Sequence, residues 1–433
     1  MGLSAGGPGR RAGGVRVLMV VRLFHPWVGG TERQAHSLAR ALVERGHDVR
    51  IVTGRWFRGT PRREVLDGVP VFRNQTLWEC FGIRGLRKFG GYLYIASLLL
   101  HLWRERDDYD VIHVHGLNYH AFAAVLAGRR LGRPVLAKLA NSGPASDVRK
   151  MRESRQLALA RFMLPTALGC DRFVALNPAV VAELTAAGVP PERIVSVPNG
   201  VDTRRPPRRD HHLHDPACLL FVGRLHPQKG VDTLLRAFAL LRPRLPRPAV
   251  LRIVGDGPRR DQLRALAVDL GVDAHVEFAG QRDDVGPYLD AADVFVLPSR
   301  AEGLSNALLE AMAAGIPPVV SDVAGNRDGV RDGHSGLTAA VDDPPALAAA
   351  LQRLLGDRTL RARLGAQARR AAERDYGLDA VAARYVALYE ELRDGTAAPA
   401  PATSATPTAT APTGTATTGT AGTPARVPAR RDP

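Results

Sequence analysis

Short apolar runs alternate with helical patterns along the first half of the chain. The run VRVLMVV at residues 15–21 predicts a strand, and the apolar positions after it recur at the spacing of one helix face (Ala35, Leu38, Ala39, Leu42). Similar patterns predict strands at 48–54, 110–116, 134–140, 171–177 and 193–200, and helices at 120–132 and 178–188. Because short apolar strands alternate with amphipathic helices, we expect a parallel sheet covered on both faces.

The same alternation begins again at residue 218. It predicts strands at 218–224, 249–257, 275–280, 293–299 and 317–322, and helices at 231–241, 259–271, 285–292 and 306–315. A length of 433 residues also favours more than one domain. We therefore predict an α/β protein with two Rossmann-like βαβ domains facing a central cleft. Ligands of such sheets bind at the carboxyl ends of the strands.

The segments outside these patterns set the domain boundaries. The segment 201–217 is rich in Pro, Arg and His and has no apolar period, which is typical of a linker. A metal site at His211, His212 and His214 is the alternative for its histidines. We expect a flexible leader at 1–14, a first domain at 15–200, the linker at 201–217, a second domain at 218–378, a helix at 379–395 that crosses back to the first domain, and a disordered Thr/Ala/Pro-rich tail at 396–433.

The formal net charge of +16 favours anionic partners, which include phosphate-bearing ligands, nucleic acid and an acidic membrane surface. Basic patches interleaved with aromatic residues are not visible, which argues against nucleic acid. The apolar stretch 92–103 is too short to span a bilayer and predicts either a buried helix or a helix on a membrane surface. Three isolated cysteines without a CxxC pair fit a reducing, cytoplasmic compartment.

Candidate chemistry follows the first strand of the second half. In FVGRLHPQKG, Arg224 and Lys229 flank a loop between that strand and a helix, where two cations could bind a diphosphate. In RIVGDGP, Gly255 allows a close approach of the backbone to a ligand. Arg282, in GQRDDV, follows another strand at a position suited to a nucleotide base. Each of these loops, taken alone, also fits an ordinary solvated turn.

The stretch LPSRAEGLSNALLE carries two acids with seven residues between them. Pro298 ends the strand, and Ser305 is a good N-cap for the next helix. The amides of Gly303, Leu304 and Ser305 would then face an anion at the start of that helix. Glu302 on the loop and Glu310 in the helix could accept hydrogen bonds from sugar hydroxyls.

These motifs resemble those of the retaining glycosyltransferases of family 4, which have the GT-B architecture. The resemblance covers residues 15 to about 393 and is carried by FVGRLHPQKG, EGLSNALLE, GGTERQAHSLARALVERGHDV, SVPNGVD and AGIPPVVSD. It implies that Arg224 and Lys229 neutralise a donor diphosphate, that Glu310 binds the nucleotide ribose and that Glu302 contacts the transferred sugar. It also implies that the 303–305 loop offers amides to the phosphate.

In the first domain, the resemblance places Gly29 and Gly30 in a glycine loop close to the donor phosphate and the acceptor. It places His115 near the reacting sugar, although His113 would share the same strand face. Two positions depart from the family pattern. Asp328 stands where a glutamate is common, and Lys138 stands where a His-Gly pair is common.

The resemblance implies retaining transfer of a hexose-type sugar from a nucleotide diphosphate sugar to a carbohydrate or lipid-linked acceptor, in cell-surface polysaccharide or glycolipid biosynthesis. We expect no metal or other cofactor, and no nucleic acid partner. We expect a cytoplasmic protein that contacts an anionic membrane surface peripherally. The alternatives are a sugar-nucleotide epimerase of the same fold and a non-catalytic binder of sugar nucleotides or nucleic acid.

Overall fold

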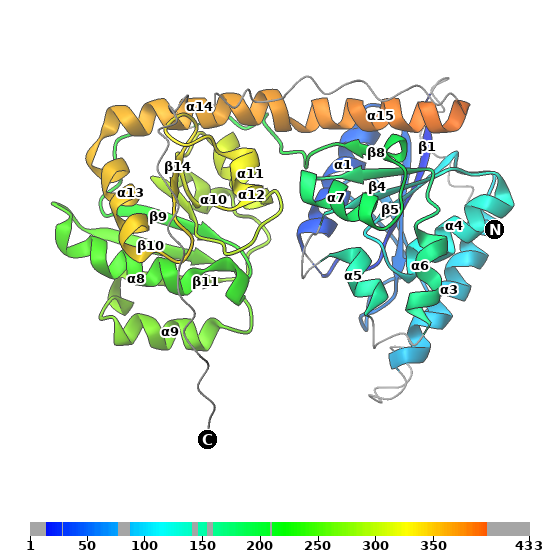
Figure 1. Ribbon diagram of the computed structural model, residues 1–433, viewed down its shortest axis with the longest axis horizontal. Coiled ribbons are helices and arrows are strands. Elements are labelled where there is room, and N and C mark those ends of the chain that lie inside the picture. The colour runs from blue at the N-terminus through cyan, green and yellow to red at the C-terminus, as the bar shows by residue number, and fades with distance from the viewer. Residues whose placement is uncertain are drawn as a thin grey trace, which may run out of the picture. The chain divides into compact units, whose positions relative to one another are not determined.

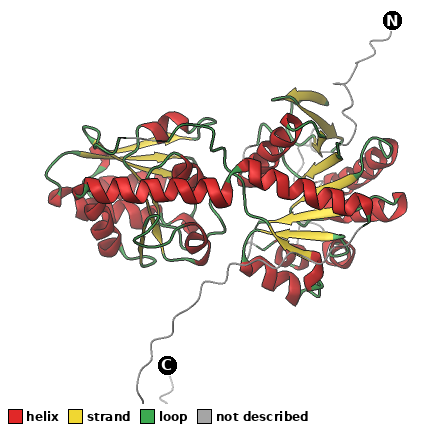
Figure 2. Ribbon diagram, turned by 90° about the horizontal axis from the view of Figure 1, so that it is seen from above, coloured by secondary structure: helices red, strands yellow, loops and turns green. Residues whose placement is uncertain are grey.

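The computed structural model describes residues 14–27, 29–76, 87–140, 146–153, 159–207 and 210–395. The predicted tail at 396–433 and the predicted leader, apart from Gly14, lie outside these residues. The described residues form two sheets with helices packed on their faces (Figures 1 and 2), and both sheets belong to one compact unit. The predicted fold class, two parallel-sheet α/β domains, is confirmed.

The first sheet has eight strands in the order β3-β4-β2-β1-β5-β6-β7-β8. Every neighbouring pair is parallel except β3 with β4. The strands are β1 Arg16–Val21, β2 Asp48–Gly54, β3 Arg63–Leu66, β4 Val69–Asn74, β5 Val111–His115, β6 Val135–Leu139, β7 Arg172–Ala175 and β8 Ile194–Ser196. The helices of this half are α1 Gly30–Glu44, α3 Arg87–Arg104, α4 Tyr119–Leu131, α5 Asp147–Arg152, α6 Ala160–Ala167, α7 Pro178–Ala186 and η3 Pro191–Arg193.

Strand β1 shows why its sequence is apolar throughout. Leu18 and Val20 enter one hydrophobic core, whereas Val17, Met19 and Val21 enter another on the opposite face of the sheet. A central parallel strand is covered on both faces, so both sets of alternating side chains must be apolar. The continuous run at 15–21 is the signal that predicted this strand.

The hairpin of β3 and β4 was not predicted. Its turn is the dipeptide Asp67-Gly68, with positive φ angles of 46° and 80°. Two central residues with positive φ make the tight turn that joins antiparallel strands, and Asp-Gly is a preferred sequence for it. The sequence EVLDGVPV therefore carries a hairpin signal, because Asp67-Gly68 lies between two short strands.

The second sheet has six strands in the order β11-β10-β9-β12-β13-β14, all of them parallel. The strands are β9 Ala217–Val222, β10 Ala249–Val254, β11 Val276–Gly280, β12 Val294–Leu297, β13 Pro318–Ser321 and β14 Leu337–Ala339. The helices are η4 Pro227–Lys229, α8 Val231–Leu241, η5 Arg242–Arg244, α9 Arg260–Asp269, η6 Asp273–His275, α10 Gly286–Asp290, α11 Asn306–Ala313, α12 Ala324–Gly329, α13 Pro344–Gly356 and α14 Arg358–Tyr376.

The last described helix, α15 at Leu378–Asp394, packs on the first sheet and not on the second (Figure 1). Leu378, Val381, Tyr385 and Tyr389 join the core on the α1 face of that sheet. Residue 377 also forms a β-bridge with Val201. The polypeptide therefore links the two sheets twice, at residues 201–216 and between α14 and α15.

The connecting segment that was predicted as a linker is fixed by hydrogen bonds. Arg361 donates to the carbonyl of His211, and Arg369 donates to the carbonyl of Thr203 at 2.5 Å. His214 lies on Asp293, with 2.9 Å between its Nδ1 and a carboxylate oxygen. Its histidines therefore contact different parts of the second half. Among the described residues, no group of three or more His, Cys, Asp or Glu could hold a metal ion.

Helix α3 contains the apolar stretch that allowed two interpretations. Tyr94, Leu98 and Leu102 are buried, which is the result expected for a core helix. Leu100 and Trp103, however, are 44% and 56% exposed. None of the helices in the described ranges is long and apolar enough to cross a membrane.

Candidate active site

The loops that follow β9 and β12 lie against each other because these strands are hydrogen-bonded neighbours in the middle of the second sheet. The amide of Arg300 donates to the carbonyl of Gln228 at 2.8 Å, and Gln228 Nε2 donates to the carbonyl of Ala301 at 2.8 Å. Gly230 has a φ of 63°, and a Cβ atom there would lie 2.1 Å from the carbonyl oxygen of Pro298. Only glycine permits this contact between the two loops.

Two of the predicted site residues form an ion pair across these loops. Lys229 Nζ lies 2.6 Å from Glu302 Oε2, and both side chains are largely buried, with 19% and 11% exposed. Arg224, on the same loop as Lys229, is exposed, and its guanidinium has no ion pair with the described residues. Among the described residues of the β9 loop, the exposed Arg224 therefore lies near a neutralised pair without an ion pair of its own.

Arg300 holds the loop that carries Glu302, and sequence analysis did not identify it. Its guanidinium lies 2.7 Å from Asp232 and 2.8 Å from Asp342, and it donates to the carbonyl of Pro227 at 2.6 Å. A hydrogen bond from Arg300 also lowers the pKa of Asp342. No local pattern in the sequence signals this cluster, because Asp342 is 42 residues away and comes from the segment after β14.

The start of α11 lies where it was predicted. Strand β12 ends at Leu297, and Ser305 is the N-cap residue of α11, although its hydroxyl makes no capping hydrogen bond. The first amides of a helix lack partners within the helix and favour an anion. Gly325 packs against this loop so closely that a Cβ atom would lie 2.0 Å from the carbonyl oxygen of Gly303. This packing holds the backbone at Glu302 and Gly303.

Glu310 lies about one turn into α11 and is half-buried. Burial raises the pKa of its carboxyl, the nearby Arg33 lowers it, and Asp284 raises it further. Arg33 also donates to the carbonyl of Arg282 at 3.1 Å. Arg282, which was predicted to lie near the nucleotide base, therefore has its backbone close to Glu310, whereas its side chain is exposed.

Gly255 was predicted to allow a close approach of the backbone to a ligand. In the structure it lies close to the protein backbone at Gly223. Its φ is 133°, and a Cβ atom would lie 2.0 Å from the carbonyl oxygen of Gly223. Gly257 is packed in the same way against Leu225. These contacts explain the glycines without a ligand, and they support the loop that carries Arg224.

The glycine loop of the first half begins α1, with Gly29 as N-cap residue and Gly30 as first residue. A Cβ atom on Gly30 would lie 3.4 Å from Asn306 Nδ2, and the same amide donates to the Gly30 carbonyl at 3.1 Å. Asn306 in turn accepts a hydrogen bond from Asn199 at 2.8 Å. Sequence analysis did not single out either asparagine, although both lie in the quoted motifs.

Glu32 is a further residue that sequence analysis missed. A Cβ atom added to Gly29 would lie 2.4 Å from Glu32 Oε2. The Glu32 carboxylate therefore occupies the space beside the start of α1. Burial raises the pKa of this carboxyl, whereas backbone hydrogen bonds from Glu32 and Gly29 lower it. A donor phosphate at Gly29 would have to displace Glu32.

The structure distinguishes the two candidate histidines on β5. His113 Nδ1 lies 2.7 Å from the Tyr389 hydroxyl on α15, whereas neither ring nitrogen of His115 has a hydrogen-bond partner among the described residues. Both rings are buried, and burial holds the pKa of each well below its ordinary value. A buried, unpartnered imidazole needs an explanation, and a substrate hydroxyl would provide one for His115.

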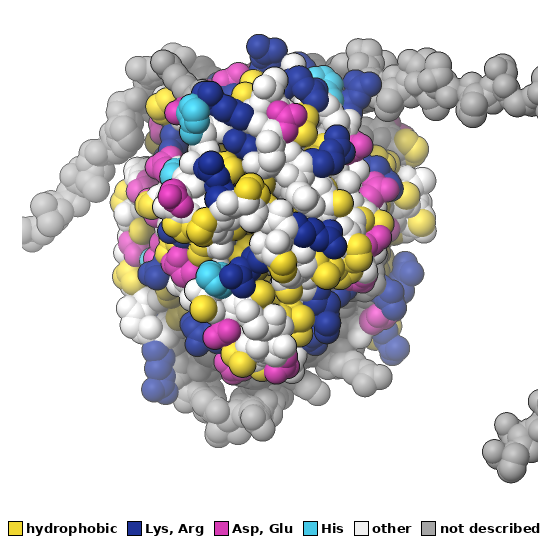
Figure 3. Space-filling model, turned by 90° about the vertical axis from the view of Figure 1, so that its left-hand side faces the viewer, with side chains coloured by type: hydrophobic (Ala, Val, Ile, Leu, Met, Phe, Trp, Pro, Cys, Tyr) yellow, Lys and Arg dark blue, Asp and Glu magenta, His cyan; other side chains and the backbone are white. Residues whose placement is uncertain are grey.

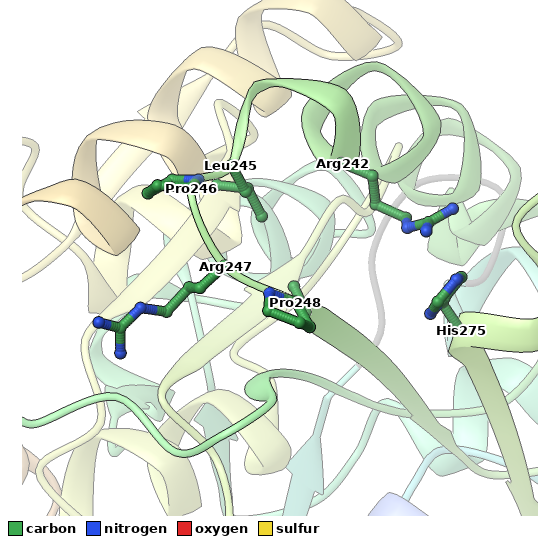
Figure 4. A pocket seen from close by; sticks show the side chains of 7 residues that line it. Arg242, Leu245, Pro246, Arg247, Pro248 and His275 are labelled. Carbon is green, nitrogen blue, oxygen red and sulfur yellow. The ribbon is translucent and has the colours of Figure 1, made fainter.

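A separate pocket of about 350 Å³ lies at the amino end of β10, away from these loops (Figure 4). Arg242, Arg247 and His275 line it, but Arg247 points away from the other two in the close-up view. On the face of the second half shown in Figure 3, cationic side chains are interspersed with acidic and apolar ones. This face does not present a continuous basic surface.

Two protein-family models match the chain. Residues 28–205 match "Glycosyltransferase Family 4", and residues 216–357 match "Glycosyl transferases group 1". Together they include the glycine loop, His115, Arg224, Lys229 and both glutamates.

Individual proteins agree with these matches. A D-inositol 3-phosphate glycosyltransferase of Jonesia denitrificans is 31% identical over 84% of this chain and 92% of its own. A lipopolysaccharide core biosynthesis glycosyltransferase, LpsE of Rhizobium meliloti, is 37% identical over 40% of this chain and 50% of its own. The crystal structure of Anabaena HepE in complex with UDP and glucose covers 87% of this chain and all of that one, with 18% identity and a TM-score of 0.68. This structural likeness shows the shared fold.

Proposed function

The chain belongs to glycosyltransferase family 4, and we propose that it transfers a hexose-type sugar, with retention, from a nucleotide diphosphate sugar to an acceptor hydroxyl. One observation carries the proposal. The β9 and β12 loops bring Lys229 and Glu302 into contact beside the first turn of α11 and the exposed Arg224. Cations and free helix amides fit a diphosphate, and carboxylates fit sugar hydroxyls.

Donor binding would rearrange the Lys229–Glu302 pair. The diphosphate would lie between Arg224, Lys229 and the Gly303–Ser305 amides, so that Lys229 exchanges a carboxylate for a phosphate. Glu302 would then turn to the hydroxyls of the sugar, and Glu310 would accept hydrogen bonds from the ribose. The UDP complex of the similarly folded HepE supports a nucleotide donor for this chain.

The reaction breaks the bond between the anomeric carbon and the diphosphate oxygen, and the electron pair leaves with the nucleotide diphosphate. The acceptor oxygen bonds to the anomeric carbon from the same face, and its proton passes to the departing phosphate. Arg224, Lys229 and the helix amides would stabilise the charge that develops on the leaving group. We propose that these protein cations take the role that a divalent metal has in other transferases.

The acceptor side is inferred from the relatives. D-inositol 3-phosphate and the lipopolysaccharide core are named for two of them, which favours an anionic, hydroxyl-rich acceptor of cell-surface or glycolipid biosynthesis. We place the protein in the cytoplasm, where nucleotide sugars are made. We also propose peripheral membrane contact through the exposed apolar residues of α3.

The test has a binding arm and a reaction arm. Thermal shifts with UDP-, GDP- and ADP-sugars should show a higher melting temperature with one donor, because a ligand of the native state stabilises it. NMR of the product formed with that donor should show the donor's anomeric configuration. Conversion of the sugar nucleotide without an acceptor would indicate an epimerase, and no shift with any donor would refute the proposal.

A further inference from the structure

The unusual Lys138 lies beside His115 at the carboxyl end of the first sheet. Lys138 is aligned with His115 in the parallel pairing of β6 with β5. His113 precedes His115 by two residues, and the two rings are 4.2 Å apart. All three side chains therefore share one sheet face, the face that α15 covers. We call His113, His115 and Lys138 the β5–β6 basic cluster.

Lys138 is buried without a counter-charge. The residue is 5% exposed, and its closest aromatic contact is the Tyr385 ring, with 5.5 Å between Nζ and the ring centroid. Among the residues that the structure describes, the Lys138 ammonium has no hydrogen-bond or ion-pair partner. A buried cation that lacks a partner is costly unless it loses its proton, so such a lysine in a native structure marks a candidate ligand site.

The described residues around Lys138 do not supply a negative charge. They are His115 in the aligned position of β5, Val174 in the aligned position of β7 and Tyr385 on α15, with His113 beside His115 and Tyr389 beside His113. Burial raises the pKa of both tyrosines, so they stay neutral at physiological pH. Burial alone lowers the pKa of Lys138 to about 7. The cluster thus has a lysine that readily loses its proton and two neutral imidazoles.

The cluster also lies next to the donor loop. Ala140, two residues after Lys138, has its carbonyl oxygen 3.1 Å from the place that a Cβ atom on Gly303 would occupy. A ligand group at Lys138 would therefore lie close to the loop assigned to the donor. Within the described part of the chain, both ring nitrogens of His115 lack partners, which leaves further hydrogen-bonding capacity at the same place.

We propose that Lys138, together with His115, binds an anionic group of the acceptor, a phosphate or a carboxylate, close to the hydroxyl that is glycosylated. This inference rests on the proposed function, since it assigns the acceptor of the same site. The bound anion supplies the counter-charge that the described residues around Lys138 do not provide. It also keeps Lys138 protonated. When the pH is above the pKa that Lys138 has without the anion, binding is therefore accompanied by the uptake of a proton.

The experiment is calorimetric titration of the full chain saturated with UDP, using two pairs of probes. D-inositol 3-phosphate is compared with myo-inositol, and D-glucuronate with D-glucose. The titrations are made at pH 8 in buffers of different ionisation enthalpy, which reveals proton uptake. One anionic probe should bind more tightly than its uncharged match, and its binding should be accompanied by the uptake of nearly one proton by the protein. Lys138→Gln should weaken that binding about 10- to 100-fold and abolish the proton uptake. Lys138→Arg should retain the affinity but take up no proton.

Lys150→Gln is the matched control, because Lys150 is exposed on α5, and it should behave as wild type. Equal binding of the anions by wild type and Lys138→Gln, or binding of no anionic probe, overturns the proposal. If Lys138→Gln instead weakens UDP binding alone, the anion that Lys138 meets is the donor phosphate, and the acceptor assignment falls. The proposed function would survive these outcomes, but failure of UDP itself to bind wild type would refute both.

Discussion

The ammonium group of Lys229 lies 2.6 Å from the Glu302 carboxylate, so the two charges assigned to the diphosphate and to the sugar of the donor neutralise each other. The pair joins the loop after β9 to the loop after β12. Each partner must therefore be released before it can bind its part of the donor. The pair keeps two largely buried charges compensated until the diphosphate enters.

This coupling predicts the behaviour of a double-mutant cycle. Lys229→Met and Glu302→Gln should each lower kcat/KM by roughly 100-fold or more, since loss of one charge-stabilising group in such a site costs about 3 kcal/mol in the barrier. The loss of kcat/KM in the double variant should be far smaller than the product of the two single losses, because each single change also leaves a buried charge unpaired. Steady-state kinetics of the three variants measure the coupling. Multiplicative losses would show that the two residues act independently.

Arg300 is predicted to act by positioning Glu302. Arg300→Ala should lower kcat about 10-fold or more, because the loop loses its anchors to Asp232 and Asp342, while the affinity for UDP changes less. These ion pairs are partly exposed, so the loss of stability should be only about 1 kcal/mol. Kinetics, UDP titration and thermal melting of the same variant separate the effects.

A surface pair provides the control for this prediction. Arg327 is exposed and pairs with Asp322 at 2.9 Å, so Arg327→Ala should leave kcat unchanged. If Arg300→Ala lowers the melting temperature and UDP affinity in step with kcat, Arg300 supports the fold in general and does not position the loop.

Glu310 should make donor binding dependent on pH. Burial raises its pKa above 4.5. On acidification, the carboxylate that accepts hydrogen bonds from ribose therefore becomes protonated at a higher pH than an ordinary glutamate. UDP affinity should therefore fall as the pH falls through this raised value. Glu310→Gln should bind UDP at least 10-fold more weakly and show no such dependence. Titrations between about pH 4.5 and 8 test both statements.

The same shift has an opposite effect on stability. Between pH 4.5 and the raised pKa, the folded protein binds more protons than the unfolded chain, so stability decreases as the pH rises. At neutral pH the ionised, half-buried carboxylate is thus unfavourable, and Glu310→Gln should raise the melting temperature of the ligand-free protein. A lower melting temperature would mean that Glu310 has a stabilising partner in the fold.

The fold was predictable because its strands are buried on both faces. The run at 15–21 and its counterparts in both sheets are apolar at consecutive positions. Amphipathic helices separate these runs along the chain. The β3–β4 hairpin departs from this rhythm, and its burial alternates along β4. It was not predicted because it does not follow the βα repeat, although Asp67-Gly68 is a strong local turn signal.

The candidate site was predictable where its residues are close in sequence. Lys229 and Glu302 lie in recognisable motifs that end two adjacent strands, so topology brings them together. The contacts of Arg300 with Asp342 and of Asn306 with Gly30 join distant segments that no local pattern connects. The backbone packing of Gly255 could not be told from a ligand approach, because both require the absence of a Cβ atom.

Lys138 should destabilise the folded protein in a defined range of pH. Its pKa is lowered to about 7 from an ordinary value of 10.5, so between these values the unfolded chain binds a proton that the folded protein does not. Stability therefore rises with pH across this window and is lowest, with respect to this group, below pH 7. Lys138→Met should melt at a higher temperature than wild type at pH 6, and the difference should shrink toward pH 10. A constant difference would show that Lys138 is charged throughout this range.

The exposed apolar residues of α3 predict contact with an anionic membrane. Leu100 and Trp103 are 44% and 56% exposed, and the guanidinium of Arg106 lies 5.4 Å from the Trp103 ring. Apolar side chains beside cations are typical of helices that lie at a lipid surface. The protein should sediment with phosphatidylglycerol vesicles at low salt and much less at about 0.5 M salt, where exposed charges are screened. Leu100→Ser with Trp103→Ser should reduce the bound fraction several-fold.

The control for the membrane prediction is an exposed apolar residue in the second half. Val268 on α9 is 61% exposed, so Val268→Ser removes exposed apolar surface at a different place, although less of it than the two α3 side chains present together. It should leave vesicle binding unchanged if α3 provides the contact. Equal losses in both variants would indicate non-specific adsorption, because the effect would then follow exposed apolar area and not location. Wild-type protein that stays in the supernatant with anionic vesicles at low salt would exclude this contact, and the acceptor would then have to reach the site without the membrane.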